Sequence, residues 1–441
     1  MEKIKKLRKL IGDLNLDGYI VPKNDEFFCE YVPKSKDNLK FISNFSGSFG
    51  FALILKKKNY LFIDGRYALQ ANIQSGKEFD IINISKKLPS NMFFKENLSI
   101  GYDPKLHTEK NLNTFFKNGK FKLIAINDNL IKKIKKNKNN DNNFKKFFLL
   151  KDFEAGESSK SKINRLSNSL EKNKIDIQFI SAPENVAWLL NIRGMDTKYS
   201  PIPNCYLIID KRKNINLFCD LVKVKNINFN FKNIKIKSLK ELENYLLKLK
   251  NKKFRLDASS CSIFFKDIIK KNNHIIEFQD PIYFYKSIKN KIEIKNTVNS
   301  HILDGVAVTK FLFWLKRNYK KMKISEIDAQ NKLLKFRKKS KKFKTLSFPT
   351  ISGSGPNGAI IHYNANSSSN RILKKGDIYL VDSGGQYNFG TTDVTRTISL
   401  DNNNKRIKNI FTRVLKGHIA VTNYKLNKNT TGSEIDKAAR S

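Results

Sequence analysis

Hydrophobic positions follow a helical period at the start of the chain and form short, strand-length runs after it. In the first 14 residues the apolar positions recur at helical spacing, at Ile4, Leu7, Leu10, Ile11 and Leu14. Apolar runs of strand length follow at Tyr19–Val21, Phe51–Leu55 and Tyr60–Ile63, bounded by proline, lysine or glycine. Helical stretches and apolar runs continue to alternate up to residue 126. Such alternation within one compact unit predicts an α/β domain.

A second region repeats this outline. A helical stretch over 158–173 leads to apolar runs that include Tyr206–Ile209 and Ile215–Phe218. The segment Asn191–Gly194 corresponds to Asn44–Gly47, although the offset between the two regions drifts along the chain. These features predict two diverged copies of one α/β domain. Asn191–Gly194 is expected to form a tight turn before a strand, because glycine frees the backbone there.

The segment between the copies, 127–150, is rich in asparagine and lysine. Because it offers little apolar surface to offset the entropy of ordering, it is expected to be a solvated loop. The domain boundaries predicted from these shifts in composition are 1–152, 153–286 and 287–441.

The third region opens with two predicted helices that should cover a curved sheet. The first carries apolar residues at helical spacing, at Ile294, Val298, Ile302 and Val306. The second begins with Ser325–Asp328, which resembles a capping box, and is expected to bury Leu333 and Leu334. The basic stretch Arg337–Lys344 is expected to be an exposed helix end.

Residues 349–400 are poor in charge for this lysine-rich chain, and they hold two aspartates within β-forming segments. Ile378–Val381 and Thr391–Thr395 have strand composition, and the residues between them favour turns, which predicts a β-hairpin. A turn centred on Tyr387-Asn388 would place Asp382 directly opposite Asp393, with Cβ atoms about 4.5–5.5 Å apart. Two carboxylates at that distance repel each other unless a cation lies between them.

The facing aspartates therefore predict a metal site. Hard oxygen ligands at short spacing suit Mn, Zn or Co, and two metal ions can share one bridging carboxylate. The alternative is that Asp382 and Asp393 are solvent-facing turn residues, but Asp382 follows an apolar run, where an unpaired charge is costly to bury. His362 is a third candidate, because it ends the apolar run Ala359–Tyr363 and could point into a cleft beside the hairpin; a lone histidine is otherwise often a core residue.

Three segments of this region resemble the catalytic-domain motifs of aminopeptidase P, the Xaa-Pro aminopeptidases of the pita-bread metallopeptidase family. They are SFPTISGSGPNGAIIHY at 347–363, VDSGGQY at 381–387 and GTTDVTRT at 390–397. The resemblance extends upstream to Asn185–Gly194 and Phe41–Tyr67, so it covers essentially the whole chain. It implies an α/β protein with two creatinase-like α/β domains followed by a pita-bread α+β catalytic domain that is C-terminally incomplete.

The resemblance also implies an activity. It implies an aminopeptidase that releases the N-terminal residue from peptides with proline at the second position, through a hydroxide activated by two divalent metal ions, with Mn favoured and Zn or Co as alternatives. Asp382 and Asp393 would be two of the ligands, with Asp393 bridging, and His362 would be a substrate-side catalytic histidine. The family further suggests a homodimer.

One departure from the family pattern limits this expectation. The family's later ligands are a histidine and two glutamates, whereas after Asp393 this chain has only His418 and Glu434 before it stops at Ser441. The setting of His418 looks like a helix after the hairpin and not like the ligand position. The 441-residue chain is therefore expected to bind metal weakly and to be inactive by itself, either as part of a longer protein or as a decayed gene product.

Two other functions remain open. A catalytically silent pita-bread protein could bind peptides in the same cleft, although such a protein would have little reason to keep both aspartates and His362. A prolidase-like dipeptidase is the nearer alternative, and the duplicated N-terminal half favours the three-domain aminopeptidase over it. The nucleotide sequence after codon 441 would distinguish a peptidase from a silent protein.

The composition restricts partners and compartment. The 85 basic residues exceed the 40 acidic residues by 45, but only 13 are arginine, whereas a reader of bases or phosphates would be expected to use arginine more. No specific nucleic-acid partner is therefore predicted. No apolar run reaches 18 residues, so no membrane span is expected. The four cysteines show no CxxC spacing, and the sequence is interpreted as a soluble, cytoplasmic protein with reduced thiols.

Overall fold

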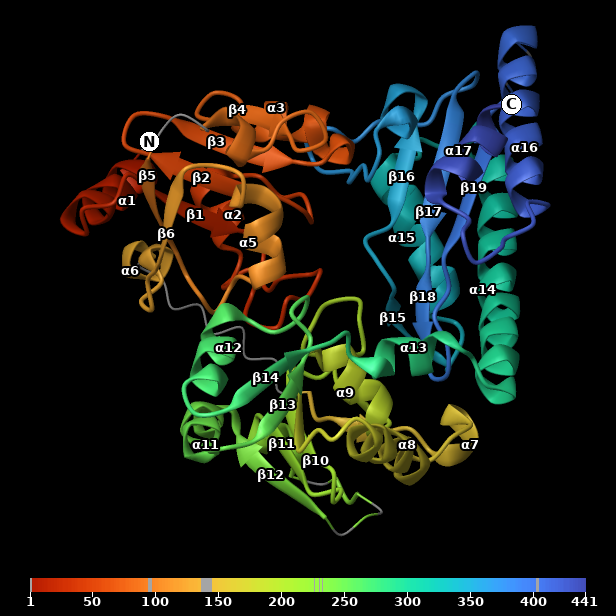
Figure 1. Ribbon diagram of the computed structural model, residues 1–441. Helices are drawn as coiled ribbons and strands as arrows, with labels where there is room; N and C mark the ends of the chain where they lie inside the picture. The colour runs from red at the N-terminus through yellow and green to blue at the C-terminus, as the bar shows by residue number, and fades with distance from the viewer. Residues whose placement is uncertain are drawn as a thin grey trace. The chain divides into compact units, whose positions relative to one another are not determined.

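A computed structural model of the chain describes residues 2–93, 97–135, 145–225, 227–229, 231, 233–401 and 404–441 (Figure 1). The chain divides into two compact units. One comprises Met1–Val306, Arg337–Pro349 and Ser383–Asp393, and the other comprises Ala307–Phe336, Thr350–Asp382 and Val394–Ser441.

The first domain is built on a six-stranded sheet with the order β4-β3-β2-β1-β5-β6. Its strands are β1 (Gly18–Pro22), β2 (Phe51–Leu55), β3 (Asn59–Ile63), β4 (Asp80–Asn83), β5 (Leu98–Tyr102) and β6 (Phe121–Ala125). Its helices are α1 (Glu2–Asp13), α2 (Asn38–Ser43), α3 (Ala68–Ser75), α4 (Pro89–Met92), α5 (Glu109–Phe116) and α6 (Leu130–Ile134). The helical period at the start of the chain is confirmed, because Ile4, Leu7 and Ile11 of α1 are buried in the core.

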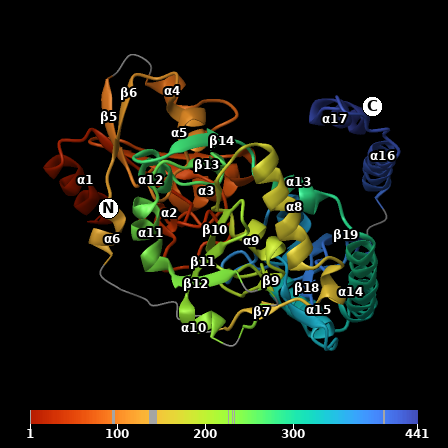
Figure 2. The same ribbon diagram turned by 60° about the horizontal axis from the view of Figure 1, so that its bottom comes forward.

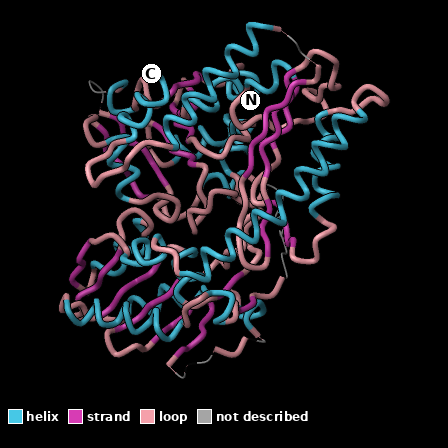
Figure 3. Tube along the Cα trace, turned by 90° about the vertical axis from the view of Figure 1, so that its right-hand side faces the viewer, coloured by secondary structure: helices cyan, strands magenta, loops and turns pink. Residues whose placement is uncertain are grey.

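The second domain has a six-stranded sheet with the order β12-β11-β10-β8-β13-β14. Its strands are β8 (Ile177–Ile180), β10 (Tyr206–Asp210), β11 (Ile215–Cys219), β12 (Ile234–Ser238), β13 (Lys253–Leu256) and β14 (His274–Glu277). Its helices are α7 (Asp152–Ala155), α8 (Ser159–Lys172), α9 (Pro183–Leu189), α10 (Leu221–Val224), α11 (Leu242–Lys248), α12 (Ile263–Lys270) and α13 (Pro281–Ser287). Helices α8 and α9 cover one face of the sheet, and α11 and α12 cover the other (Figure 2). Figure 3 shows helices in cyan beside strands in magenta.

The predicted duplication is confirmed by topology. Counted along the chain, the first strand of each sheet is antiparallel to the second and parallel to the fifth. The outer pairs β3-β4 and β11-β12 are both parallel. Local contacts repeat as well. Asp17 accepts a hydrogen bond from the backbone N–H of Ser99 at 2.9 Å, and Asp176, at the equivalent position, accepts one from Lys253 at 3.0 Å.

The prediction of a solvated loop over 127–150 is wrong at both ends, since Phe147 is buried and Phe148–Leu149 form the strand β7, and the start of the segment forms a helix. Asn129 caps α6, because its side chain accepts from the backbone N–H groups of Ile131 and Lys132, and Leu130 and Ile131 are fully buried. Two apolar side chains next to a capping residue are enough to form one helical turn against the core. The asparagine-rich centre of that segment, 136–144, lies outside the described residues.

The tight turn predicted at Asn191–Gly194 is only partly correct. Asn191 has a left-handed backbone with φ 52°, but Ile192–Arg193 form a short strand, β9, that pairs with β7 (Phe148–Leu149). Gly194 is needed for a close approach and not for a special backbone angle. A Cβ there would lie 2.8 Å from the Cα of Pro203 and 2.9 Å from the ring of Phe147.

The last region contains long helices and short strands. These are α14 (Lys291–Asn318), α15 (Glu326–Arg337), β15 (Phe343–Leu346), β16 (Ile351–Ser354), β17 (Ile378–Ser383), β18 (Gly385–Tyr387), β19 (Val394–Ser399), α16 (Lys405–Thr422) and α17 (Gly432–Arg440). The strands form a three-stranded sheet, β16-β17-β19, and a pair, β15-β18. Both α14 and α15 pack on the three-stranded sheet, as expected (Figure 1).

The residues through which α14 and α15 contact the sheet differ in part from those predicted. Val308, Phe311 and Leu315 of α14 are buried against the sheet, whereas the predicted apolar stripe is more than half exposed at Ile294, Val298 and Ile302 and half exposed at Val306. Leu333 of α15 is fully buried, as predicted, and Leu334 is half-buried.

Two further sequence-based expectations concern the whole chain. Among the described residues no helix is both long and apolar enough to cross a bilayer. The four cysteines are free thiols, as predicted, and burial raises the pKa of the buried Cys205, Cys219 and Cys261.

Candidate metal centre

Asp382 lies on β17, the central strand of the three-stranded sheet. The strand alternates, with Tyr379 and Val381 buried in the core and Asp382 on the opposite, half-buried side. On the β16 side its partner is Ile351. The Oδ1 atom of Asp382 is buried and has no hydrogen-bond partner among the described residues. Because a buried acceptor without a donor is costly, this carboxylate fits a position where a cation would be its partner.

The predicted pairing across the hairpin is wrong by two residues. Gln386 pairs with Thr391, and the backbone N–H of Tyr387 donates to the carbonyl of Gly390 at 2.8 Å, so the turn is centred on Asn388 and Phe389. The sequence-based reasoning placed the turn one residue earlier.

The same register holds at both ends of the strand pair. The backbone N–H of Thr392 donates to the carbonyl of Gly385, and the N–H of Leu400 donates to the carbonyl of Asp377, each at 2.9 Å. This register places Thr395 opposite Asp382. A shift of two residues keeps every side chain on the same face of a sheet, because side chains alternate with a period of two.

Asp393 is exposed and directly precedes β19. The backbone beside it is held firmly, because Thr392 is buried, its hydroxyl accepts from the N–H of Gly385 at 2.9 Å, and its carbonyl accepts from the hydroxyl of Ser347 at 2.9 Å. The hairpin register places Gly384 opposite Asp393. A Cβ on Gly384 would lie 1.9 Å from the carbonyl oxygen of Thr392, so only glycine allows the backbones to approach this closely.

The strand predicted to end at His362 is absent. Gly355–Ala359 form a short 3-10 helix, η3, and His362 lies in the turn that follows, with a left-handed φ of 56° and an exposed side chain. The apolar run Ala359–Tyr363 therefore does not form a strand. Pro356 at the second position of η3 favours the helical turn, because its φ is fixed near the helical value.

Glu326 holds the loop that carries His362, and sequence reasoning treated it only as part of a capping box. That box is present, since Ser325 and Asp328 exchange hydrogen bonds as predicted, and it starts α15 in the correct place. Glu326 itself is fully buried. Its carboxylate accepts hydrogen bonds from the backbone N–H of Ser354 at 2.7 Å and from the backbone N–H of Arg371 at 3.0 Å.

Two side chains of the loop complete the set of donors to Glu326. Asn357 donates through its amide at 3.1 Å, and Tyr363 donates through its hydroxyl at 2.8 Å. Burial raises the pKa of Tyr363 to about 12, so the hydroxyl remains protonated and able to donate. The loop before His362 is thereby tied at several points to one buried carboxylate.

Arg337 was expected at an exposed helix end, and that prediction is wrong. Its side chain is fully buried and forms a bidentate ion pair with Asp304 of α14, with distances of 2.7 and 2.8 Å. It also donates to the hydroxyl of Ser383 at 3.0 Å, and Tyr387 donates to Asp304 at 2.7 Å. A basic run in sequence does not reveal that one of its members has a buried partner 33 residues earlier. The pair fixes Ser383, which is the neighbour of Asp382.

The described part of the chain contains no group of three or more histidine, cysteine, aspartate or glutamate side chains that could hold a metal ion. The histidine and the glutamate that follow Asp393 in the chain are not part of such a group. His418 is exposed on α16, and Glu434 is in a capping box with Thr431 at the start of α17. Of the three residues predicted for the site, Asp382 is the one with a buried oxygen for which the described residues provide no donor.

Comparison with known families divides the chain into three matched parts. Residues 3–117 and 138–293 match two creatinase/prolidase N-terminal domain families, and residues 296–441 match metallopeptidase family M24. The fold and these family matches define a metallopeptidase that carries two creatinase-type domains.

Named relatives place the chain more closely. It is 34% identical to a probable Xaa-Pro aminopeptidase P of Laccaria bicolor, covering 100% of this chain and 71% of the relative, and 32% identical to Xaa-Pro aminopeptidase 1 of Dictyostelium discoideum, covering 100% and 73%. It also superimposes on the X-prolyl aminopeptidase of Caenorhabditis elegans, described as a cytosolic enzyme with a di-nuclear active site, with a TM-score of 0.89 and 27% identity over 100% of this chain and 76% of that one. The chain belongs to the Xaa-Pro aminopeptidase P family of M24 metallopeptidases.

Prolidases share only the fold. A prolidase from Thermococcus sibiricus matches with a TM-score of 0.52 and 20% identity over 64% of this chain. That match reaches a smaller part of the chain than the aminopeptidase does.

Proposed function

We propose that this protein is a metal-dependent aminopeptidase that releases the N-terminal residue from peptides with proline in the second position. Similarity to Xaa-Pro aminopeptidases along the full chain supports the substrate class. The observation in this chain that carries the proposal is the buried Oδ1 of Asp382, an acceptor for which the described residues provide no donor. A prolidase-like dipeptidase receives less support, because the prolidase match covers only part of the chain.

Asp382 and Asp393 are proposed as two ligands of a pair of divalent ions, with Mn, Zn or Co suited to hard carboxylate oxygens. The corrected register differs from the predicted one by two residues, so each aspartate keeps the face of its strand that the prediction gave it. The proposal therefore does not require the two aspartates to pair directly. Bound ions would lower the pKa of a water molecule and polarise the substrate carbonyl.

His362 is proposed to donate a hydrogen bond to the substrate carbonyl or to the oxyanion that develops from it. Its turn conformation makes the side chain accessible, and the hydrogen bonds around Glu326 restrict the loop on which it lies. In a bond before proline the leaving nitrogen carries no hydrogen. The enzyme must then recognise the scissile bond through its carbonyl oxygen, and His362 is proposed to donate to that oxygen.

The test uses the protein expressed from its whole open reading frame, with added Mn, on an Arg-Pro-Pro peptide. Asp382→Asn and Asp393→Asn are each expected to abolish turnover and to weaken Mn binding. His362→Asn keeps a residue that tolerates a left-handed backbone, and it is expected to lower kcat by about 10²–10³ without changing Mn binding. Asp436→Asn, at an exposed position on α17, serves as the matched control and should retain full activity.

The outcomes separate the candidate functions. Wild-type protein that binds Mn and peptide without cleaving it would support a silent binding protein and overturn the peptidase proposal. Turnover that survives Asp382→Asn would overturn the ligand assignment.

We further propose that the protein is a cytoplasmic homodimer and that it has no specific nucleic-acid partner. The exposed stripe of Ile294, Val298, Ile302 and Val306 supports an interface, because apolar patches of this kind usually mark surfaces that another polypeptide covers. A molar mass measured by light scattering tests the oligomeric state, and a monomer at micromolar concentration would contradict it.

A further inference from the structure

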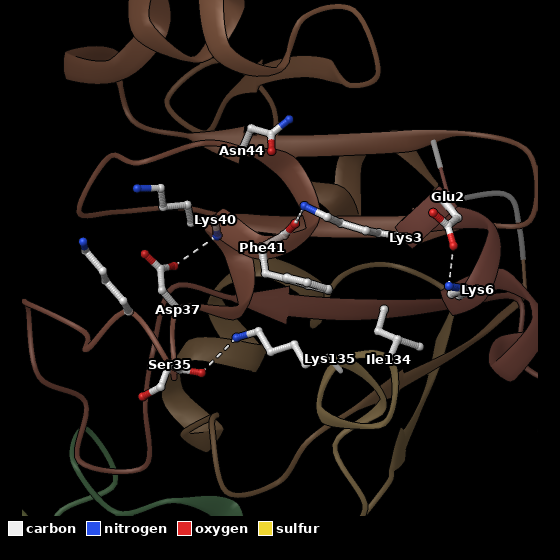
Figure 4. A pocket seen from close by; sticks show the side chains of 11 residues that line it. Glu2, Lys3, Lys6, Ser35, Asp37, Lys40, Phe41, Asn44, Ile134 and Lys135 are labelled. Carbon is white, nitrogen blue, oxygen red and sulfur yellow. Dashed lines mark hydrogen bonds and ion pairs between the residues drawn. The ribbon is translucent and has the colours of Figure 1, made fainter. Parts of the chain in front are cut away.

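The first domain contains a cavity of about 630 Å³ bordered by α1, α2 and α6, which we call the lysine pocket (Figure 4). Its charged lining residues are the lysines Lys3, Lys6, Lys34, Lys40 and Lys135 and the acids Glu2 and Asp37. Five ammonium groups thus face two carboxylates. The volume lies in the range of small-molecule sites, which are typically about 300–1,000 Å³.

Both carboxylates of the lysine pocket already have partners. Asp37 accepts from the ammonium group of Lys23 at 2.6 Å and also caps α2 by accepting from the backbone N–H of Lys40. Glu2 pairs with Lys6 on the next turn of α1. The side-chain ammonium groups of the other four lysines have no carboxylate partner within the part of the chain that the structure describes. Among the described residues, the pocket therefore holds more positive charge than its carboxylates neutralise.

Two of these ammonium groups meet at one aromatic ring. The nitrogen of Lys3 lies 4.7 Å and that of Lys135 lies 5.3 Å from the centroid of Phe41. Lys3 also donates to the carbonyl of Phe41 at 3.0 Å. Lys3 is in α1 and Lys135 directly follows α6, and Figure 4 shows both side chains beside Phe41. Since both distances share one centroid, the two charges lie at most about 10 Å apart, within the range where charges in a protein interact.

Lys135 is the least exposed of the five lysines. Its ammonium group donates to the carbonyl of Ser35 at 3.0 Å and to the side-chain oxygen of Asn38 at 3.1 Å, both of which are neutral acceptors. Burial lowers the pKa of Lys135, and the charges of Lys132 and Lys3 lower it further, against the opposing effect of Asp37. An anion bound beside Lys135 would relieve this repulsion and replace the water that burial removes.

We propose that the lysine pocket is a binding site for a small anion that carries several phosphate groups, such as a triphosphate. Lysine ammonium groups act as compact point charges with three donors each. Two of them meet at Phe41, and Lys34 and Lys40 line the same cavity, which matches an anion with clustered oxygens. The carboxylates of an acidic peptide are spread along a chain and would need a groove instead. This inference does not depend on the proposed peptidase activity.

The general basicity of the chain requires a matched comparison. A second hollow, of about 660 Å³, is also lined by five lysines, Lys250, Lys252, Lys253, Lys270 and Lys271. All five are exposed, and no phenyl ring lies among the lining residues. We call it the control cluster. If positive charge alone were sufficient, the two clusters would bind anions equally.

The test is isothermal titration of the full chain with inorganic tripolyphosphate in 150 mM KCl. Saturable binding is expected at one site. Lys34→Gln/Lys40→Gln, which changes two exposed side chains, should weaken binding at least tenfold, and Lys3→Gln/Lys135→Gln should do the same. Lys250→Gln/Lys271→Gln in the control cluster should change the affinity less than twofold. Circular dichroism and thermal unfolding verify that each variant is folded.

Three results would overturn the inference. The first is equal losses in the lysine-pocket and control-cluster variants, which would indicate general attraction of anions to lysine. The second is the absence of saturable binding. The third is equally tight binding of citrate, which would indicate any multivalent anion and not a phosphate compound. Tighter binding of adenosine triphosphate than of tripolyphosphate would support the site and add a contact to the base.

Discussion

The buried ion pair between Arg337 and Asp304 gives the sharpest prediction about stability. Both side chains are fully buried, and the pair is bidentate. Removing one partner leaves the other charge buried and uncompensated, which typically costs about 3–5 kcal/mol. Arg337→Met leaves the Asp304 carboxylate buried without its cation, and the hydroxyl of Tyr387 still donates to it. Asp304→Leu leaves the guanidinium group of Arg337 buried without its carboxylate. The Nη1 atom of that group is already buried and without a partner among the described residues.

The double variant Arg337→Met/Asp304→Leu removes both charges. The remaining penalty comes from the hydroxyls of Tyr387 and Ser383, which lose their partners at about 1–3 kcal/mol for each group left unsatisfied. Each single variant already leaves one of these hydroxyls without its partner, in addition to an uncompensated buried charge, so we expect the double variant to be no less stable than either single variant. Its loss should fall well below the roughly 6–10 kcal/mol that two independent losses would give.

The assay is urea unfolding followed by tryptophan fluorescence. The chain has two tryptophans, and in a Trp314→Phe background Trp188, which lies in the same compact unit as Arg337 and Asp304, is the only reporter. The control is Arg440→Met, which removes an exposed i,i+4 pair with Asp436 and should change stability by no more than about 0.5 kcal/mol. A loss of about 1 kcal/mol or less for Arg337→Met, or additive losses in the double variant, would refute the reasoning.

The remaining predictions concern one buried titratable group and one buried acceptor. Burial lowers the pKa of His107 to about 3 from an ordinary value near 6.5, so the unfolded chain binds a proton that the folded chain excludes. Stability should then fall as the pH drops from about 6.5 toward 3, by up to about 1.4 kcal/mol per unit. His107→Phe should shift the acid-unfolding midpoint to lower pH, whereas the exposed His301→Phe should not; equal shifts would contradict the assignment. Glu326→Gln replaces one accepting carboxylate oxygen by an NH₂ group that faces other donors, which should cost about 1–3 kcal/mol. Hydrogen exchange over Gly355–Tyr363 should then be faster than in the control Glu434→Gln. Unchanged exchange over Gly355–Tyr363 would exclude Glu326 as the anchor of that loop.

Local patterns predicted the elements that local sequence controls. The strands at Tyr206–Ile209 and Ile215–Phe218 were placed within one residue, because apolar β-branched runs between turn residues leave few alternatives. The capping box at Ser325 and Asp328 was also identified correctly, since both partners lie within one helical turn. The duplicated domain could be recognised because two strand series occur in the same order.

Features that depend on pairing over long distances could not be predicted. The register of the hairpin depends on which residues form the turn, and several turn formers lie between Asp382 and Asp393, so an error of one residue in the turn moved the pairing by two. The burial of Arg337 depends on Asp304, and the role of Glu326 depends on donors from Ser354 onward. None of these partners lies within one helical turn, and sequence periodicity gives no information about them.

The two α/β copies show which constraints persist when side chains diverge. The equivalent Thr108 and Ser262 cap the helices α5 and α12 with their hydroxyls, and the two residues also form a β-bridge with each other. Next to them His107 and Cys261 are both buried, although one side chain is titratable near neutral pH and the other is a small apolar thiol. A cap must satisfy backbone N–H groups that exist in any sequence, so its hydroxyl cannot be lost cheaply. The neighbouring core position requires only volume, and that freedom is what allowed the first copy to place a histidine where acid can destabilise the fold.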